Sequence, residues 1–197
     1  MGSKSCRERR FQVLIGKVAF LFVAVLLSLP TSVKADQSDK RLDSLFNTLG
    51  QAQDAYVLRD LERQIWSIWG ALEDEKVKKE FDAGVQAMNQ GRMILALRWF
   101  NRVVKKAPEF SEAWNKRATV FYMLGKLDQS ISDIERTIDL EPRHFGAFSG
   151  LGLIYMKMGN NEAALEAFER VLVIHPHFGD VRDMAAELRE KIKGKLI

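Results

Sequence analysis

The chain has 197 residues and a formal net charge of +4, and 47% of its residues are hydrophobic and 28% charged. This length allows one folded domain with extensions, and the two shares are ordinary for a folded protein. Its single cysteine, Cys6, excludes an intramolecular disulfide.

Residues 1–35 have the pattern of a secretory signal peptide. A basic front is followed by an uncharged apolar run of 12 residues, Val18 to Leu29, which Pro30 interrupts. The small residues Val33 and Ala35 then suit a cleavage site. The sequence therefore predicts a mature chain that begins at Asp36.

An uncleaved membrane anchor is the alternative for the same segment. The uncharged stretch of residues 18–33 is shorter than the ~20 residues of a spanning helix, which favours cleavage. Without residues 1–35 the chain keeps 24 Lys and Arg residues against 25 Asp and Glu residues. That balance argues against a nucleic-acid partner, because such binding depends on neutralising phosphates.

Residues 36–76 are expected to form a pair of helices. Apolar residues at helical spacing predict one helix from Leu42 to Leu49, closed by Gly50, and a second from about Asp54 to Leu72. We interpret the pair as a degenerate repeat or an N-terminal cap. Trp66 and Trp69 on the second helix are expected to pack against the first repeat, with a partner-binding aromatic patch as the alternative.

The rest of the chain repeats with a period of 34 residues. Small, aromatic, glycine and proline positions recur at this interval, which is the signature of a helix-turn-helix solenoid. The recurring sets are Gly84/Ala118/Gly152, Gly91/Gly125/Gly159, Ala96/Ser130/Ala164, Phe100/Ile134/Phe168, Pro108/Pro142/Pro176 and Trp114/Phe148.

These residues resemble the tetratricopeptide repeat (TPR) family. Its pattern of an aromatic, Leu-Gly, Tyr, Ala, Phe and a closing Pro is complete in the third copy, whose residues are Phe148, Leu151, Gly152, Tyr155, Ala164, Phe168 and Pro176. The first copy departs from it, with Glu80 where the aromatic belongs. The stretches Trp114–Thr119 and Glu141–Gly146 are also similar to small periplasmic TPR proteins of α-proteobacteria.

The resemblance implies an all-α, right-handed helix-turn-helix solenoid of three TPR repeats. The repeats are expected at residues 77–110, 111–144 and 145–178, with helices near 76–90, 93–106, 111–124, 127–140, 145–158 and 161–174. A capping helix is expected within residues 179–197, with Met184, Leu188 and Ile192 on its buried side. The charged outer side of that helix predicts a monomer.

In this family a concave groove lined by the first helix of each repeat usually holds a peptide or a partner helix. The resemblance places these residues in the groove: Lys78, Phe81, Val85, Met88, Glu112, Asn115, Thr119, Tyr122, Ser149, Leu153 and Met156. Members that grip a C-terminal carboxylate have Lys and Asn where this chain has Phe81 and Val85, so a carboxylate clamp is not expected.

A set of charged residues interrupts the apolar pattern. Arg117 stands at a packing position and needs a partner, for which Asp133 and Glu141 are candidates. Together with Arg143 and His144 we interpret them as a structural ionic cluster, with a recognition site as the alternative.

Motifs of catalysis are missing from the sequence. It has three histidines and no cysteine beyond Cys6, no Gly-rich phosphate loop and no nucleophile motif. We therefore expect no enzyme, no metal and no cofactor.

The sequence thus predicts a non-catalytic secreted adaptor, periplasmic in a Gram-negative source, that binds a protein or peptide. Membrane contact is expected only if the signal is uncleaved, in which case the protein would be a tethered assembly factor or scaffold. Two competing hypotheses remain. One is an enzyme subunit or small-ligand binder, which requires a deep pocket with converging titratable groups, and the second is self-association through an uncapped end.

Overall fold

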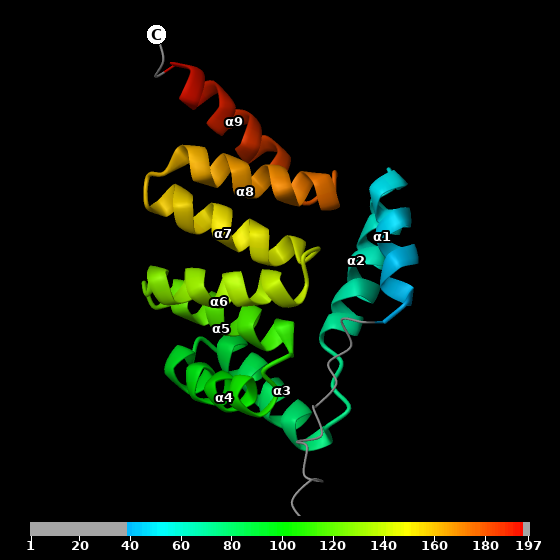
Figure 1. Cartoon of the computed structure of the whole chain (residues 1–197), viewed down its shortest axis with the longest axis vertical. Coiled ribbons are helices and arrows are strands. Elements are labelled where there is room, and N and C mark those ends of the chain that lie inside the picture. The colour runs from blue at the N-terminus through cyan, green and yellow to red at the C-terminus, as the bar shows by residue number, and fades with distance from the viewer. Residues whose placement is uncertain (1–38, 195–197) are drawn as a thin grey trace, which may run out of the picture. The chain divides into compact units, whose positions relative to one another are not determined.

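Helices account for most of residues 39–194, the part of the chain that the structure, a computed structural model, describes (Figure 1). No strand occurs among these residues. The helices in chain order are α1 (Arg41–Gln51), α2 (Ala55–Trp69), α3 (Glu75–Asn89), α4 (Met93–Lys106), α5 (Ser111–Met123), α6 (Leu127–Leu140), α7 (Phe145–Lys157), α8 (Asn161–Ile174) and α9 (Val181–Gly194). The predicted signal peptide, residues 1–35, lies outside the described residues.

The three repeats end their first helices in the same way. Gly91, Gly125 and Gly159 have φ angles of 71°, 73° and 77°, a left-handed conformation that glycine adopts without a steric penalty. The amide that follows each glycine donates to a carbonyl five residues back, as in Arg92 N–H to Ala87 at 2.9 Å. These turns place α4, α6 and α8 antiparallel to α3, α5 and α7 (Figure 1).

Within each repeat a small residue on the first helix faces a large one on the second. A Cβ atom at Gly84 would lie 2.7 Å from the Phe100 ring, and one at Gly152 would lie 2.3 Å from the Phe168 ring. The middle repeat has Ala118 and the smaller Ile134 at the same positions. A smaller residue on the first helix is therefore matched by a larger residue on the second helix, because the larger side chain fills the space that the smaller one leaves.

Helices α1 and α2 form an N-terminal hairpin whose bounds differ slightly from the predicted ones. Helix α1 continues one residue past Gly50, and α2 ends at Trp69 instead of Leu72. The Asp54 carboxylate accepts hydrogen bonds from the amides of Tyr56 and Val57 and so starts α2. Asp74 starts α3 in the same way, which leaves only a short connection after Gly70.

The sequence predicted that the tryptophans of the N-terminal hairpin pack against the first repeat, and this prediction is wrong. Trp69 is buried and stacks on His144, with ring centroids 4.2 Å apart, and Trp66 meets Phe145 at 5.4 Å. Glu62 also reaches His175 at 2.7 Å. The hairpin therefore packs on the turns that precede α7 and α9, and its core is continuous with that of the third repeat.

Helix α9 covers the end of the third repeat. It buries Val181, Ala185 and Leu188, whereas Met184 and Ile192, which were predicted on the buried side, are only half-buried. Between residues 39 and 194 no helix combines the length and the apolar character needed to cross a membrane.

Candidate partner-binding groove

The residues predicted for the groove line two neighbouring hollows. One, which we call the socket, lies between α5, α6 and α7 and has a volume of about 310 Å³. The other, the proximal pocket, lies between α2, α3 and α5 and measures about 600 Å³. The predicted residues Asn115, Thr119, Tyr122, Ser149 and Leu153 line the socket. Lys78, Phe81, Val85 and Glu112 line the proximal pocket.

The socket exists because small residues face it from all three helices. Gly146, Ser149 and Gly150 supply the α7 wall, Ala118 belongs to α5 and Ser130 to α6. The other lining residues are Asn115, Thr119, Tyr122, Met123, Ile134, Leu153 and Ile154. No lining residue carries a charge, so the socket suits an apolar group.

Three of the polar side chains that line the socket are hydrogen-bonded within the chain. The Ser130 hydroxyl donates to the Ala118 carbonyl at 2.7 Å, and the Thr119 hydroxyl donates to the Asn115 carbonyl at 3.0 Å. The Asn115 amide donates to the Glu112 carboxylate at 2.8 Å. A ligand in the socket therefore meets chiefly carbon surface.

Exposed apolar side chains surround the mouth of the socket. Met123 is 60% exposed and Leu153 is 38% exposed, and both are lining residues. The Lys157 ammonium lies 5.0 Å from the centre of the Tyr122 ring. Met156, a predicted groove residue, is 38% exposed but lines neither hollow.

In the proximal pocket, the lysines are matched by carboxylates. Lys78 pairs with Asp82, and the Lys116 ammonium lies 2.8 Å from a Glu112 oxygen. Trp66 forms part of the wall, and the Lys116 ammonium lies 5.2 Å from the centre of its ring. The N-terminal hairpin therefore covers part of the predicted groove. Met88, also predicted there, packs in the core of the first repeat.

Glu112 is a buried carboxylate with three partners. Besides Lys116 and Asn115, it accepts from His144 Nε2 at 3.1 Å. The Ala147 amide donates to His144 Nδ1, so the neutral ring carries its proton on Nε2 and donates it to Glu112. Burial alone would raise the pKa of Glu112, but Lys116 and His144 outweigh it and the pKa lies below its ordinary value. The carboxylate is thus held ionised beside the two hollows.

The residues predicted as one ionic cluster belong to separate sets. Arg117 forms a two-pronged pair with Asp133, at 2.7 and 2.6 Å, and also donates to Asn101. Glu141 does not pair with Arg117, because it lies at the turn before α7 and accepts from Arg143 at 3.1 Å.

The second of these sets joins the N-terminal hairpin to the repeats. Arg143 reaches Asp43 of α1 at 2.7 Å, and its guanidinium lies 4.6 Å from the centre of the Phe46 ring. The Trp69 indole donates to Glu141 at 3.4 Å. His144, the last member of the predicted cluster, pairs with Glu112 as described above.

The sequence analysis did not predict that Trp66 and Gly146 shape the groove together. Trp66 lies against Gly146, where a Cβ atom would come within 2.6 Å of its ring. The available signal was the glycine itself, because the groove position corresponding to Gly146 holds Lys78 and Glu112 in the other two repeats. Because Gly146 has no side chain, the Trp66 ring can occupy the space beside it.

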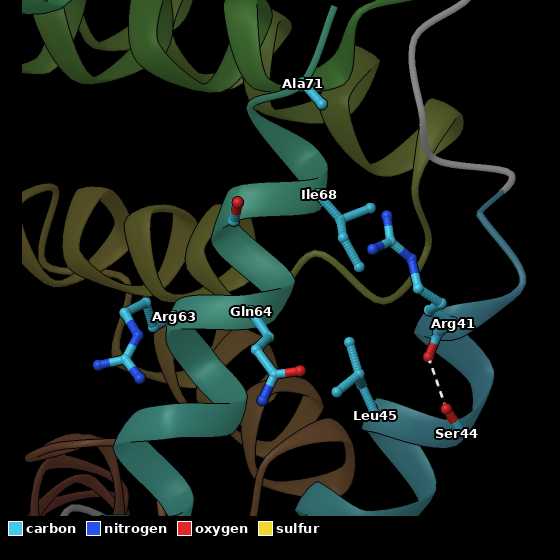
Figure 2. Close-up of a pocket in the computed structure, with 8 residues that line it drawn as sticks. Arg41, Ser44, Leu45, Arg63, Gln64, Ile68 and Ala71 are labelled. Atoms are coloured by element: carbon cyan, nitrogen blue, oxygen red, sulfur yellow. Dashed lines mark hydrogen bonds between the residues drawn. The ribbon is translucent and has the colours of Figure 1, made fainter.

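A further hollow of about 510 Å³ lies between α1 and α2 (Figure 2). Leu45 and Ile68 face each other across it, while Arg63 points away from α1 (Figure 2). Arg41 pairs with Asp39, and Arg63 pairs with Asp60. This hollow is the outer flank of the hairpin, and it lacks a buried polar group that would fix a ligand.

In the described part of the chain, no three His, Cys, Asp or Glu side chains gather as a metal site. His175 is buried and pairs with Glu62, whereas its near neighbour His177 is exposed. Burial lowers the pKa of His175, and Glu62 only partly opposes this effect.

Comparison with known proteins places the chain in a family. Tetratricopeptide repeat profiles match residues 81–136 and 146–178. A TPR repeat-containing protein of Rhizobium etli is 32% identical over 79% of this chain and 76% of its own length. Rhizobium etli is an α-proteobacterium.

Solved TPR structures show the same fold. The first TPR of Spaghetti (RPAP3), bound to the HSP90 peptide SRMEEVD, superposes with a TM-score of 0.58 at 19% identity, covering 61% of this chain and 96% of that one. MamA superposes with a TM-score of 0.57 at 20% identity, covering 80% and 84%. The repeat columns, the helical pairs and these likenesses agree, and the chain belongs to the tetratricopeptide repeat family.

Proposed function

We propose that the protein is a non-catalytic adaptor that holds a segment of a partner protein in the groove formed by α3, α5 and α7. TPR proteins mediate protein–protein interaction, including peptide binding, and are generally non-catalytic. The observation that carries the proposal is the socket, an uncharged hollow with an exposed apolar mouth on the first helices of the second and third repeats.

Burial of apolar surface supplies the driving force for such an interaction. Removing one large apolar side chain from water contributes about 1.5 to 3 kcal/mol. Met123 and Leu153 would lose exposed surface in the same event. The RPAP3 structure demonstrates that a TPR fold can hold a peptide, which supports the same type of ligand here.

The side chains that line the socket favour binding over catalysis. The socket contains Tyr122 as its single titratable lining residue, and the buried Glu112 nearby is fully engaged by Lys116, Asn115 and His144. Converging titratable groups, which a catalytic pocket requires, are absent from the socket lining.

We place this adaptor in the periplasm after removal of residues 1–35. The basic front, the apolar run and the small residues before Asp36 support export. Cell fractionation with intact-mass measurement tests this location. A soluble periplasmic protein that begins at Asp36 supports it, whereas a membrane-bound protein that keeps residues 18–33 supports the tethered scaffold instead.

The function itself is tested by affinity purification from the native cells with a charge placed at the socket. Leu153→Asp puts a carboxylate at the mouth, where it would have to be desolvated by an apolar ligand. Val173→Asp on α8 is the matched control, because Val173 is 76% exposed and lines none of the hollows described above.

The adaptor proposal predicts a partner that co-purifies with the wild type and with Val173→Asp, and that is lost with Leu153→Asp. A partner retained equally by all three proteins would show that the groove is not the binding surface. Circular dichroism of each variant verifies that the helices remain folded.

A further inference from the structure

We infer that the socket recognises one large apolar side chain of the partner segment, and that a carboxylate within a few residues of it on either side pairs with Lys157. This inference rests on the proposed function and adds the chemistry of the ligand. It is carried by three observations: the shape of the socket, the closed end at Trp66 and the unmatched positive charge at the mouth.

The shape of the socket is that of a hole for a side chain. Along α7 the residues Gly146, Ser149 and Gly150 present almost no side-chain volume, while Ile134 of α6 and Ile154 of α7 provide apolar surface. A volume of about 310 Å³ admits an aliphatic or aromatic side chain but no folded element. The groove therefore offers a defined anchor point in addition to a flat surface.

Trp66 limits the direction from which the ligand enters. Its ring lies against Gly146, at the end of the socket formed by the first residues of α7. Trp66 is held there by Trp69, His144 and Phe145, with ring centroids 5.2 to 5.4 Å away. The open end is consequently the one bordered by Met123 and Leu153, whose side chains are exposed.

At this open end the charge is positive and uncompensated. Lys157 lies over the Tyr122 ring and, among residues 39–194, has no carboxylate within ion-pair distance. Lys126, three positions after Met123, also has no ion pair within that range. The lysines of the proximal pocket are different, because Asp82 and Glu112 match them. Charge complementarity thus favours an acidic residue in the partner next to the apolar anchor.

The methionine at the mouth suits an apolar anchor of variable shape. Met123 lines the socket and is 60% exposed. Thioether side chains adapt to different apolar partners because they are unbranched and polarizable. We therefore assign the anchor to the class of large apolar residues and not to one amino acid.

The experiment is a selection of random 12-residue peptides against the tagged protein in the form that its cells accumulate. Recovered peptides are synthesised, and their dissociation constants are measured by fluorescence anisotropy. The inference predicts peptides that share a large apolar residue with Asp or Glu within about four positions on its flank, the reach of one helical turn.

Two variants test the two parts of the assignment. Gly150→Leu fills the socket and is expected to weaken binding by at least about tenfold, the loss that follows from one unburied side chain. A Cβ atom at Gly150 would lie 3.5 Å from Ile134, an ordinary contact, so the variant is expected to fold. Lys157→Glu is expected to weaken binding of the acidic peptides and to restore it when their acidic residue is changed to Lys. Val173→Leu on the exposed face of α8 is the control and should leave the dissociation constants unchanged.

The outcomes separate the inference from the proposed function. Peptides whose binding survives Gly150→Leu, or that lack an acidic residue and ignore Lys157→Glu, would overturn the inference and leave the adaptor role intact if Leu153→Asp abolishes their binding. Recovery of no binding peptide would count against the adaptor role itself.

Discussion

The indole of Trp69 and the imidazole of His144 are stacked, with centroids 4.2 Å apart and an angle of 10° between their planes. This contact joins the N-terminal hairpin to the turn between the second and third repeats. Glu62 and His175 repeat the connection one repeat further along, between residues 113 positions apart in the chain. The hairpin is therefore a side wall of the groove and not a cap on the first repeat.

Alanine substitutions at Gly146 and Gly150 form a matched pair that tests this placement of the hairpin. Both lie in α7, four residues apart, but a Cβ atom at Gly146 would lie 2.6 Å from the Trp66 ring. We expect Gly146→Ala to lower the free energy of unfolding by about 1 to 3 kcal/mol, because the Trp66 ring would have to shift from its contacts with Trp69 and Phe145. Gly150→Ala is expected to raise it by up to about 1 kcal/mol through helix propensity.

Urea denaturation followed by circular dichroism measures both effects. Equal changes for the two alanine variants would contradict the close contact between Trp66 and Gly146. Tryptophan fluorescence reports the same contact, since displacement of Trp66 exposes its ring to water.

His175 makes stability depend on pH. Burial lowers its pKa below the ordinary value near 6.5, and Glu62 only partly offsets this. The neutral ring is therefore favoured in the folded state, and its contribution is complete above about pH 6.5. It is lost as the pH falls below that value, because the unfolded chain then binds the proton more readily.

Unfolding midpoints in urea at pH 7.5, 6.5 and 5.5 measure this dependence. His175→Gln should flatten the profile over this range, while His177→Gln at the exposed neighbouring histidine should preserve it. The groups that face the His175 ring are Glu62, Phe145 and Phe178, and the charge of His177 adds the smallest contribution to the lowering of its pKa. A wild-type profile without a decline below pH 6.5 would refute the assignment to His175.

Arg117 is expected to stabilise the fold because it neutralises the buried carboxylate of Asp133. Burial raises the pKa of Asp133, and Arg117 opposes that rise. Arg117→Met should cost about 3 kcal/mol, because it leaves a buried carboxylate without its partner. The double variant Arg117→Met with Asp133→Leu should regain most of that loss, since apolar residues of similar volume can replace such a pair.

A double-mutant cycle by urea denaturation gives the coupling energy of the two residues. The exposed pair of Arg189 and Glu169 serves as the comparison, and Arg189→Met should change stability by less than about 1 kcal/mol. Additive effects of the Arg117 and Asp133 substitutions would show that the pair is not coupled.

Replacement of Glu112 is expected to lower the free energy of unfolding and to disturb the socket. Its carboxylate holds Asn115, a socket residue, together with His144 and Lys116. Glu112→Ala is expected to lower stability by about 3 kcal/mol and to change the chemical environment of the Asn115 side-chain amide. NMR spectra of side-chain amides detect the second effect, which Glu109→Ala at an exposed position should not produce.

Local spacing was sufficient to predict the repeats. The glycines at 34-residue intervals end helices, and the predicted bounds of α4, α6 and α8 coincide with the observed ones. These features depend on turn chemistry and on the fit of small against large residues within one repeat, as for Gly84 and Phe100. Both signals are local in the sequence.

The position of the N-terminal hairpin could not be predicted in this way. Its contacts join residues about 70 to 110 positions apart in the chain, such as Trp69 with Glu141 and Glu62 with His175. No repeat pattern specifies such pairs, because the hairpin occurs once. The socket was partly visible as the run of small residues at Gly146, Ser149 and Gly150, but its walls depend on α6 as well.

The measurement that tests the central claim most directly is photocrosslinking in the native cells. A photoreactive phenylalanine derivative replaces Met123 at the mouth of the socket, or Ile94 on α4, and these side chains are 60% and 58% exposed. The adaptor account predicts a discrete crosslinked partner from position 123 and none from position 94. Equal crosslinking from both positions, or none from position 123, would contradict it.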